Sequence, residues 1–206
     1  MSDIICVTNR KLCCEDFRIR IEKIAKQKPS AIILREKDLS EGEYLNLAAD
    51  IMDICRSYQI PCILHTFINA AMQLHAEHLH LPLHLLQNMP KSEQRHFTAL
   101  GASCHSDADA RDAAACGATY LIAGHIYDTD CKKGLAGRGI PFLQSICKQT
   151  ELPVYAIGGI SQKNVRDVMQ AGASGFCIMS QLMQCDDVES VFYGIRKELA
   201  NESYGS

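Results

Sequence analysis

Short apolar runs alternate along the whole chain with longer segments in which apolar residues recur at helical spacing. This alternation is typical of repeated β-strand and α-helix units around a parallel sheet, because the strands of such a sheet are buried on both faces. The apolar runs predict strands at Ile4–Val7, Ala31–Leu34, Cys62–His65, His78–Leu81, Leu100–Ser103, Tyr120–Ala123, Val154–Ile157 and Phe176–Met179. The helical segments are Asp16–Gln27, Glu41–Tyr58, Ile68–Leu74, Ala108–Cys116, Pro141–Gln149, Asn164–Ala171 and Val188–Asn201.

Several of these segments carry signals for helix ends. Ser40 and Glu43 have capping-box spacing ahead of the second helix, and Pro141 suits a first helical position. Gly117 and Gly172 stand where a left-handed residue would end a helix. The signals support the predicted helix boundaries.

Eight strand–helix alternations in 206 residues fit a single compact (β/α)8 TIM barrel of the α/β class, with residues 1–206 as one domain. An open doubly wound sheet is the competing architecture. The similar stretches Ala113–Ala118 and Met169–Ala173 each precede a predicted strand, which favours near-equivalent units and therefore the barrel. The pattern is weakest at Pro82–Phe97, where we expect a loop with a short helix from Lys91.

Composition narrows the class of partner. The net charge of −3 and the pI near 6.2 provide no broad basic field for nucleic acid or an anionic membrane, so we expect a small-molecule partner. No apolar run reaches the roughly 18 residues that span a bilayer, and the N-terminal segment lacks a targeting pattern, so we expect a cytoplasmic protein. The 11 cysteines are scattered without C-x-x-C spacing, which predicts reduced core residues.

In a TIM barrel the loops after the carboxyl ends of the strands form the active site, and those after the last two strands commonly bind phosphate. Here these loops contain Gly158-Gly159 and Met179-Ser180. Glycine lets the backbone approach an anion closely, and the positive end of the helix from Asn164 would add to the attraction. We therefore predict a phosphate site, with a simple tight turn as the alternative.

The charged triplet Arg35-Glu36-Lys37 follows the second predicted strand. In extended geometry Arg35 and Lys37 share one face while Glu36 points to the other. The two cations could grip a second anionic group, and solvated surface charge is the alternative.

The segment GHIYDTDCKKGLAGRG, residues 124–139, follows the sixth predicted strand and predicts an active-site loop. His125 is the acid/base candidate, and Lys132, Lys133 and Arg138 would favour its neutral, proton-accepting form. A purely structural histidine is the alternative. Cys131 could instead be a nucleophile, but a small apolar or hydrogen-bonding role is the simpler hypothesis.

The segment His75–His84 contains four histidines, His75, His78, His80 and His84, a grouping that could indicate a metal site. His78 and His80 alternate along a predicted strand and could point the same way, but a metal site also needs ligands that converge from elsewhere. We therefore expect no metal site here and place His80 in the barrel interior.

Together, VTNRKLC, LREKDLS, GASCHS, GHIYDTDCKKGLAGRG and AIGGISQKNV resemble the thiamine phosphate synthase superfamily over nearly the full length. This resemblance implies the TIM-barrel fold and one of two activities. Thiamine phosphate synthase joins a pyrimidine diphosphate to a thiazole phosphate with magnesium. The thiazole tautomerase (TenI) branch aromatises the carboxylated thiazole phosphate precursor.

The resemblance to the synthase branch is incomplete. The synthase patterns N-D-R-x-D and H-L-G-Q-x-D, whose aspartates hold magnesium, correspond here to His65–Asn69 and His80–His84, which contain no carboxylate. Loss of the metal from a diphosphate reaction would remove several kcal/mol of transition-state stabilisation.

Residues 124–139 resemble the tautomerase branch, which implies His125 as acid/base and the loops at Gly158-Gly159 and Met179-Ser180 as the thiazole phosphate site. Our leading hypothesis is a thiazole tautomerase without metal or other cofactor. The alternative is a thiamine phosphate synthase that recruits magnesium through other ligands and binds diphosphate through Arg35, Lys37, Ser103, Thr129 and Lys132. A third hypothesis is a non-catalytic regulator that binds thiazole or thiamine phosphate. Such a barrel could also form a homo-oligomer through exposed helices.

Overall fold

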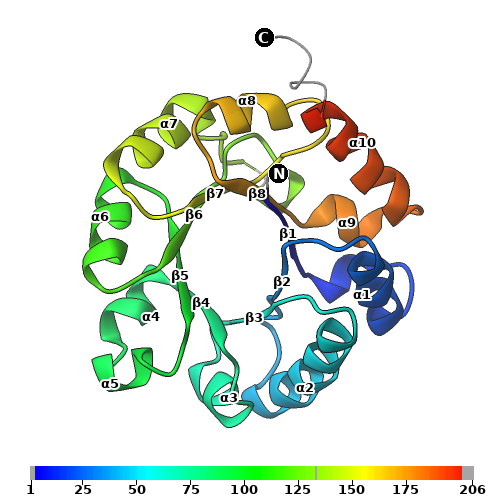
Figure 1. Ribbon diagram of the computed structural model, residues 1–206, viewed down its shortest axis with the longest axis vertical. Helices are drawn as coiled ribbons and strands as arrows, with labels where there is room; N and C mark the ends of the chain where they lie inside the picture. The colour runs from blue at the N-terminus through cyan, green and yellow to red at the C-terminus, as the bar shows by residue number, and fades with distance from the viewer. Residues whose placement is uncertain (1–2, 133, 201–206) are drawn as a thin grey trace.

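The computed structural model describes residues 3–132 and 134–200. Within them, eight parallel strands form a closed barrel in sequence order, and β8 pairs with β1 (Figure 1). The strands are β1 (Asp3–Val7), β2 (Ala31–Leu34), β3 (Cys62–His65), β4 (His78–Pro82), β5 (Ala99–Cys104), β6 (Tyr120–Gly124), β7 (Val154–Ile157) and β8 (Gly175–Ile178). The predicted TIM barrel is confirmed.

Helices surround the ring of strands (Figure 1). They are α1 (Phe17–Lys26), α2 (Glu41–Ser57), α3 (Ile68–Gln73), α4 (Leu83–Asn88), α5 (Lys91–Gln94), α6 (Asp107–Ala115), α7 (Gly139–Gln149), α8 (Val165–Gln170), α9 (Ser180–Gln184) and α10 (Val188–Ala200). The 3-10 turns η1 (Arg10–Leu12) and η2 (Asp130–Lys132) follow β1 and β6. Predicted and observed ends mostly agree within one or two residues; Asn201, the predicted end of the last helix, lies outside the described residues.

The predicted helix-end signals have the expected geometry. The Ser40 hydroxyl accepts from the Glu43 amide while the Glu43 carboxylate accepts from the Ser40 amide, so the capping box is complete. Gly117 and Gly172 have φ of 98° and 96°, the left-handed conformation that ends α6 and α8. Pro141 is not the first helical residue, because α7 begins at Gly139.

Two other local predictions are wrong. Pro82–Phe97 contains α4 as well as the short helix at Lys91, because the buried Leu86 anchors one face of α4. The last strand ends at Ile178 rather than Met179, and Ser180 begins the short helix α9, whose Leu182 and Met183 are buried. A few core side chains therefore stabilise helices too short to show a periodic pattern.

Alternate strand residues face two different cores. In β1, Ile4 and Cys6 pack with the cluster between strands and helices, whereas Ile5 and Val7 pack with the smaller cluster inside the barrel. The interior cluster also includes Tyr120 and Ile122 on β6. The same alternation, extended past the strand ends, determines which side chains reach the mouth of the barrel.

All 11 cysteines are free thiols. Among residues 3–132 and 134–200, none of the helices has the length and apolar character needed to cross a bilayer.

Candidate active site

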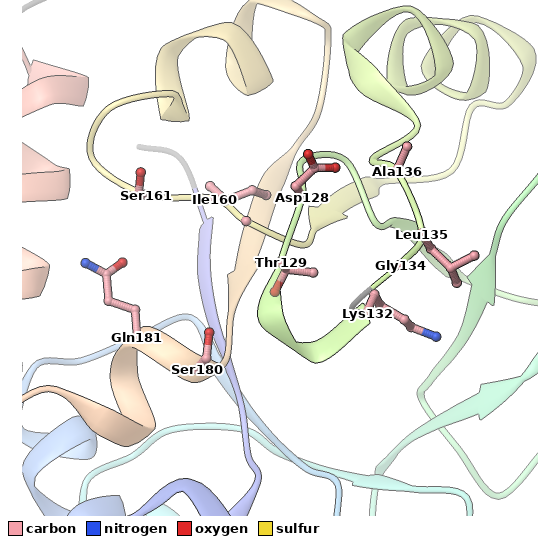
Figure 2. Close-up of a pocket in the computed structure, with 11 residues that line it drawn as sticks. Asp128, Thr129, Lys132, Gly134, Leu135, Ala136, Ile160, Ser161, Ser180 and Gln181 are labelled. Atoms are coloured by element: carbon pink, nitrogen blue, oxygen red, sulfur yellow. The ribbon is translucent and has the colours of Figure 1, made fainter.

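An inner cavity of about 420 Å³ lies at the carboxyl ends of the strands. A larger outer cavity of about 700 Å³, shown in Figure 2, adjoins it. The two cavities share six lining residues: Thr129, Lys132, Gly159, Ile160, Ser180 and Gln181. Arg138, predicted to influence His125, does not line the inner cavity and instead packs its guanidinium over the Phe142 ring. Nine residues that the sequence assigns to catalysis or substrate binding do line it: Arg35, Lys37, Ser103, His125, Lys132, Gly158, Gly159, Met179 and Ser180. The structure thus brings the predicted residues together, while their individual roles stay predictions.

Arg35 and Lys37 line the inner cavity, whereas Glu36 between them is buried on the other side. The Glu36 carboxylate accepts hydrogen bonds from the Thr8 hydroxyl at 2.7 Å and the Arg10 amide at 3.0 Å, and it pairs with the Arg10 guanidinium at 3.1 Å. These contacts hold the segment after β2 in place. They also satisfy the buried carboxylate of Glu36, which does not line the cavity. Arg35 and Lys37 therefore face the cavity without this carboxylate as a partner.

The inner cavity concentrates positive charge. Its lining contains Arg35, Lys37 and Lys132 but no aspartate or glutamate, and none of the three pairs with an acidic group in the described part of the chain. Burial lowers the pKa of Lys37, and the charges of Arg35 and Lys132 lower it further. An anion would relieve this repulsion, so the cavity suits a small anionic ligand.

We expect Arg35→Met to weaken binding of a small carboxylate anion, oxalate, by about 10- to 100-fold, the usual loss when a charged hydrogen-bond donor is removed. Calorimetric titration measures the affinity. Lys11→Met is the matched control, because Lys11 is exposed and pairs with Asp38 at 2.9 Å away from the cavity lining. Equal weakening in the two variants would assign the effect to overall charge and not to the cavity.

The segment between β6 and α7 folds back on itself beside the cavity. The amides of Arg138 and Gly139 donate to the carbonyls of His125 and Ile126, both at 2.9 Å. The chain therefore leaves the barrel at β6 and returns next to it before α7 begins. These hydrogen bonds hold His125 half-buried in the cavity wall.

The tautomer of His125 follows from its hydrogen bond. Nε2 lies 3.2 Å from the carbonyl oxygen of Leu135. A carbonyl can only accept, so Nε2 carries the proton and Nδ1 is the basic nitrogen of the neutral ring. An imidazole held in one tautomer at a cavity wall can take up and return a proton.

The Gly158-Gly159 pair allows two loops to approach closely. Gly158 has φ of 103°, and a Cβ there would overlap the Cβ of His125 and lie 2.8 Å from its Cα. Gly159 has φ of 65°, and a Cβ there would lie 2.6 Å from the carbonyl oxygen of Asp128. Both positions need glycine because of backbone conformation and close packing. The pair is therefore a tight turn as well as part of the cavity wall.

Backbone amides are available next to these glycines. The amides of Gly159, Ile160 and Ser180 donate no hydrogen bond to the described residues, and all three residues line both cavities. Figure 2 shows Ile160 after β7, Ser180 at the start of α9 and Thr129 after β6 around one opening. Free N–H groups at such an opening can bind an anion, as the phosphate prediction requires.

Two buried histidines, His65 on β3 and His80 on β4, reach the inner cavity, with ring centroids 5.3 Å apart. Burial, with the charges of Lys37 and Arg35, lowers the pKa of His80 to about 3. Burial is also the main reason that the pKa of His65 lies well below its usual value. Both rings are therefore neutral near pH 7.

The donors in this cavity do not suit the magnesium ion that the synthase resemblance implies. Magnesium prefers carboxylate and other oxygen ligands, whereas this lining offers imidazoles, cationic side chains and a few hydroxyls. Asn69 and His84, which end the stretches corresponding to the synthase patterns, lie exposed on α3 and α4. Over the described ranges, no three His, Cys, Asp or Glu side chains are grouped as a metal site.

The cavity also includes side chains to which the sequence analysis assigned no role. Asn9 follows β1, and His105 follows β5. The Nδ1–H of His105 donates to the Gly124 carbonyl at 2.7 Å, which leaves Nε2 as its free nitrogen. Alternation counted from the interior-facing strand residues would have indicated both positions.

Cys131 of the 124–139 loop lines the inner cavity as an exposed free thiol. Lys133, predicted to influence His125, lies outside the described residues.

A family model described as thiamine monophosphate synthase (TMP-TENI) matches residues 4–182. Thiamine-phosphate synthase 2 of Streptococcus pneumoniae serotype 4 is 30% identical over 201 residues, which cover 95% of this chain and 94% of the relative. Thiamine-phosphate synthase of Clostridium acetobutylicum is 30% identical over 188 residues, covering 89% and 88%.

Solved structures show the same similarity. Thiamine phosphate pyrophosphorylase from Pyrococcus furiosus superimposes with a TM-score of 0.83 at 26% identity, covering 98% of this chain and 97% of that one. A 3-hexulose-6-phosphate synthase matches with a TM-score of 0.72 at 15% identity, covering 96% and 99%, which is a likeness of fold. The names of the thiamine-related proteins favour the synthase alternative over the tautomerase.

Proposed function

Because the chain belongs to the thiamine monophosphate synthase (TMP-TENI) family, we propose that it is an enzyme of thiamine biosynthesis that acts on a thiazole phosphate. The proposed reaction is the tautomerisation that aromatises 2-carboxythiazole phosphate. The observation that carries this choice is the composition of the inner cavity, which combines His125 with three cations and has no carboxylate in its lining.

The proposed substrate has two anionic groups, and the cavity offers two places for them. The free amides at Gly159 and Ser180 would hold the phosphate. Arg35 and Lys37 would face the carboxylate across the cavity. A ligand bound in this way would place its ring beside the wall that contains His125.

The chemistry requires only that a proton and a double bond move within the substrate. Nδ1 of His125 would take the proton from one position and return it at another, so no atom is gained or lost. Aromatic stabilisation of the product drives the reaction. The nearby cations would stabilise negative charge that develops during proton removal.

The second candidate is thiamine phosphate synthase, which the names of the relatives favour. The residues proposed to bind its diphosphate all line the inner cavity: Arg35, Lys37, Ser103, Thr129 and Lys132. The side chains that line the inner cavity argue against this candidate, because they do not suit the magnesium ion of the synthase reaction.

Two assays on one purified preparation separate these candidates. We expect conversion of the exocyclic thiazole tautomer in the presence of a chelator, and no comparable diphosphate release from the pyrimidine and thiazole substrates with magnesium. Robust magnesium-dependent diphosphate release without tautomerisation would establish the synthase instead. Calorimetric binding of thiazole phosphate with no turnover in either assay would favour a non-catalytic regulator.

A further inference from the structure

A line of polar side chains crosses three adjacent strands at the inner cavity. Nε2 of His80 on β4 lies 2.9 Å from Oγ of Ser103 on β5, and Nδ1 lies 3.2 Å from the hydroxyl of Tyr120 on β6. His80 and Tyr120 are buried, with 1% and 7% of their surfaces exposed, whereas Ser103 lines the cavity. Ser103 is therefore the end of this line that a ligand can reach.

The direction of the hydrogen bonds follows from the donors available. The hydroxyl of Tyr120 has no other acceptor within the described part of the barrel, and a buried hydroxyl proton without an acceptor costs about 1–3 kcal/mol. It therefore donates to Nδ1 of His80. A neutral imidazole then carries its single proton on Nε2, which donates to Oγ of Ser103.

Ionisation does not disturb this order. Burial raises the pKa of Tyr120 well above its usual value, so its hydroxyl keeps the proton. The lowered pKa of His80, about 3, keeps the ring neutral. The same tautomer therefore persists across the neutral pH range.

We propose that Tyr120 and His80 are positioning residues that hold Ser103 as a hydrogen-bond donor to the substrate. This inference rests on the proposed function. Because Oγ of Ser103 accepts the proton of His80 and makes no other bond to a described residue, its own O–H is free to donate into the cavity. An electronegative atom of the bound thiazole phosphate would receive it.

Gly101 on β5 makes room for this arrangement. A Cβ at Gly101 would overlap the ring and hydroxyl of Tyr120 and lie 2.5 Å from Nδ1 of His80. Any larger residue would push Tyr120 and His80 apart. The absence of a side chain at this position thus permits the contact between the first two members of the line.

The tautomer can be measured without any variant. Long-range ¹H–¹⁵N correlation spectra of the labelled wild-type protein, with the His80 ring assigned through its backbone, report which nitrogen is protonated. We expect protonated Nε2 and unprotonated Nδ1. The opposite assignment would overturn the proposal. The hydroxyl of Ser103 would then donate its proton to Nε2 of His80 and could not donate it to the substrate.

Kinetics test whether the line acts through Ser103. We expect Tyr120→Phe to lower kcat/KM for tautomerisation by about 3- to 10-fold, the effect of one neutral hydrogen bond. In a Ser103→Ala background, Tyr120→Phe should lower kcat/KM further by less than about twofold, because the serine hydroxyl through which Tyr120 acts is already missing. Equal losses in both backgrounds would contradict the positioning role.

Tyr155→Phe is the matched control. Tyr155 packs edge-on against Tyr120, with ring centroids 5.8 Å apart, but its hydroxyl bonds to Asp3 at 3.1 Å. It should retain the wild-type kcat/KM; a loss equal to that of Tyr120→Phe would mean that both act through barrel packing. Absence of tautomerase activity in the wild type would refute the proposed function alone, since the spectra test the tautomer independently.

Discussion

His125→Asn should slow conversion of the exocyclic thiazole tautomer by about 100- to 10,000-fold with chelator present, the usual contribution of one general acid/base. Asparagine keeps a polar side chain but cannot take up the proton that Nδ1 of His125 accepts. Single-turnover rates with purified protein measure the effect. Binding of inorganic phosphate should change little, because the proposed phosphate contacts are the backbone amides of Gly159 and Ser180.

His96→Asn is the control for this variant, because His96 is exposed and absent from the linings of both cavities. A His125→Asn enzyme as fast as wild type would remove His125 from the mechanism. His105→Asn then becomes the informative variant, since His105 also lines the cavity and its Nε2 is free. A large loss in that variant alone would transfer the acid/base role to His105.

The second large effect is expected for Gly158→Ala. The added Cβ would overlap His125 and would occupy a backbone position with φ of 103°. Displacing a catalytic group by about 1 Å costs on the order of 100-fold in rate, and the strained conformation costs about 1–3 kcal/mol. We therefore expect about a 100-fold loss of kcat/KM and a free energy of unfolding, from urea denaturation, lower by about 1–3 kcal/mol.

Gly172→Ala separates backbone strain from displacement of His125. Gly172 has φ of 96°, but a Cβ there would meet only the Cβ of Cys147, at 3.5 Å. It should lose comparable stability and keep its activity. If Gly158→Ala were as active as Gly172→Ala, close packing against His125 would not be needed for catalysis.

Local sequence patterns predicted most of the elements because each pattern reports burial of a short segment. Apolar runs such as Ala31–Leu34 and Val154–Ile157 coincide with the observed strands. Helices α4 and α9 were not predicted, because each begins at most two residues after the end of a strand and has no turn signal in between. Their apolar residues therefore do not stand out from the preceding apolar run as a separate helical pattern.

The cavity lining was predictable where strand ends and alternation were combined. Arg35 and Lys37 on one side, with Glu36 on the other, follow from period-two geometry. Asn9 and His105 obey the same geometry, two residues beyond the interior-facing Val7 and Ser103, but the sequence assigned neither of them a role. The closed barrel shows that both side chains line the cavity.

The sequence by itself determined the order of strands and helices, the ends of the strands that would carry the site, and the loop at 124–139 that would supply an imidazole. Only the tertiary structure decided which side chains touch: the carboxylate of Glu36 on Thr8, and His80 between Ser103 and Tyr120. The physical reason is the distance along the sequence over which each kind of interaction acts. Periodicity depends on neighbours a few residues apart, whereas these hydrogen bonds join residues separated by 23 to 40 positions, which meet only when the barrel closes.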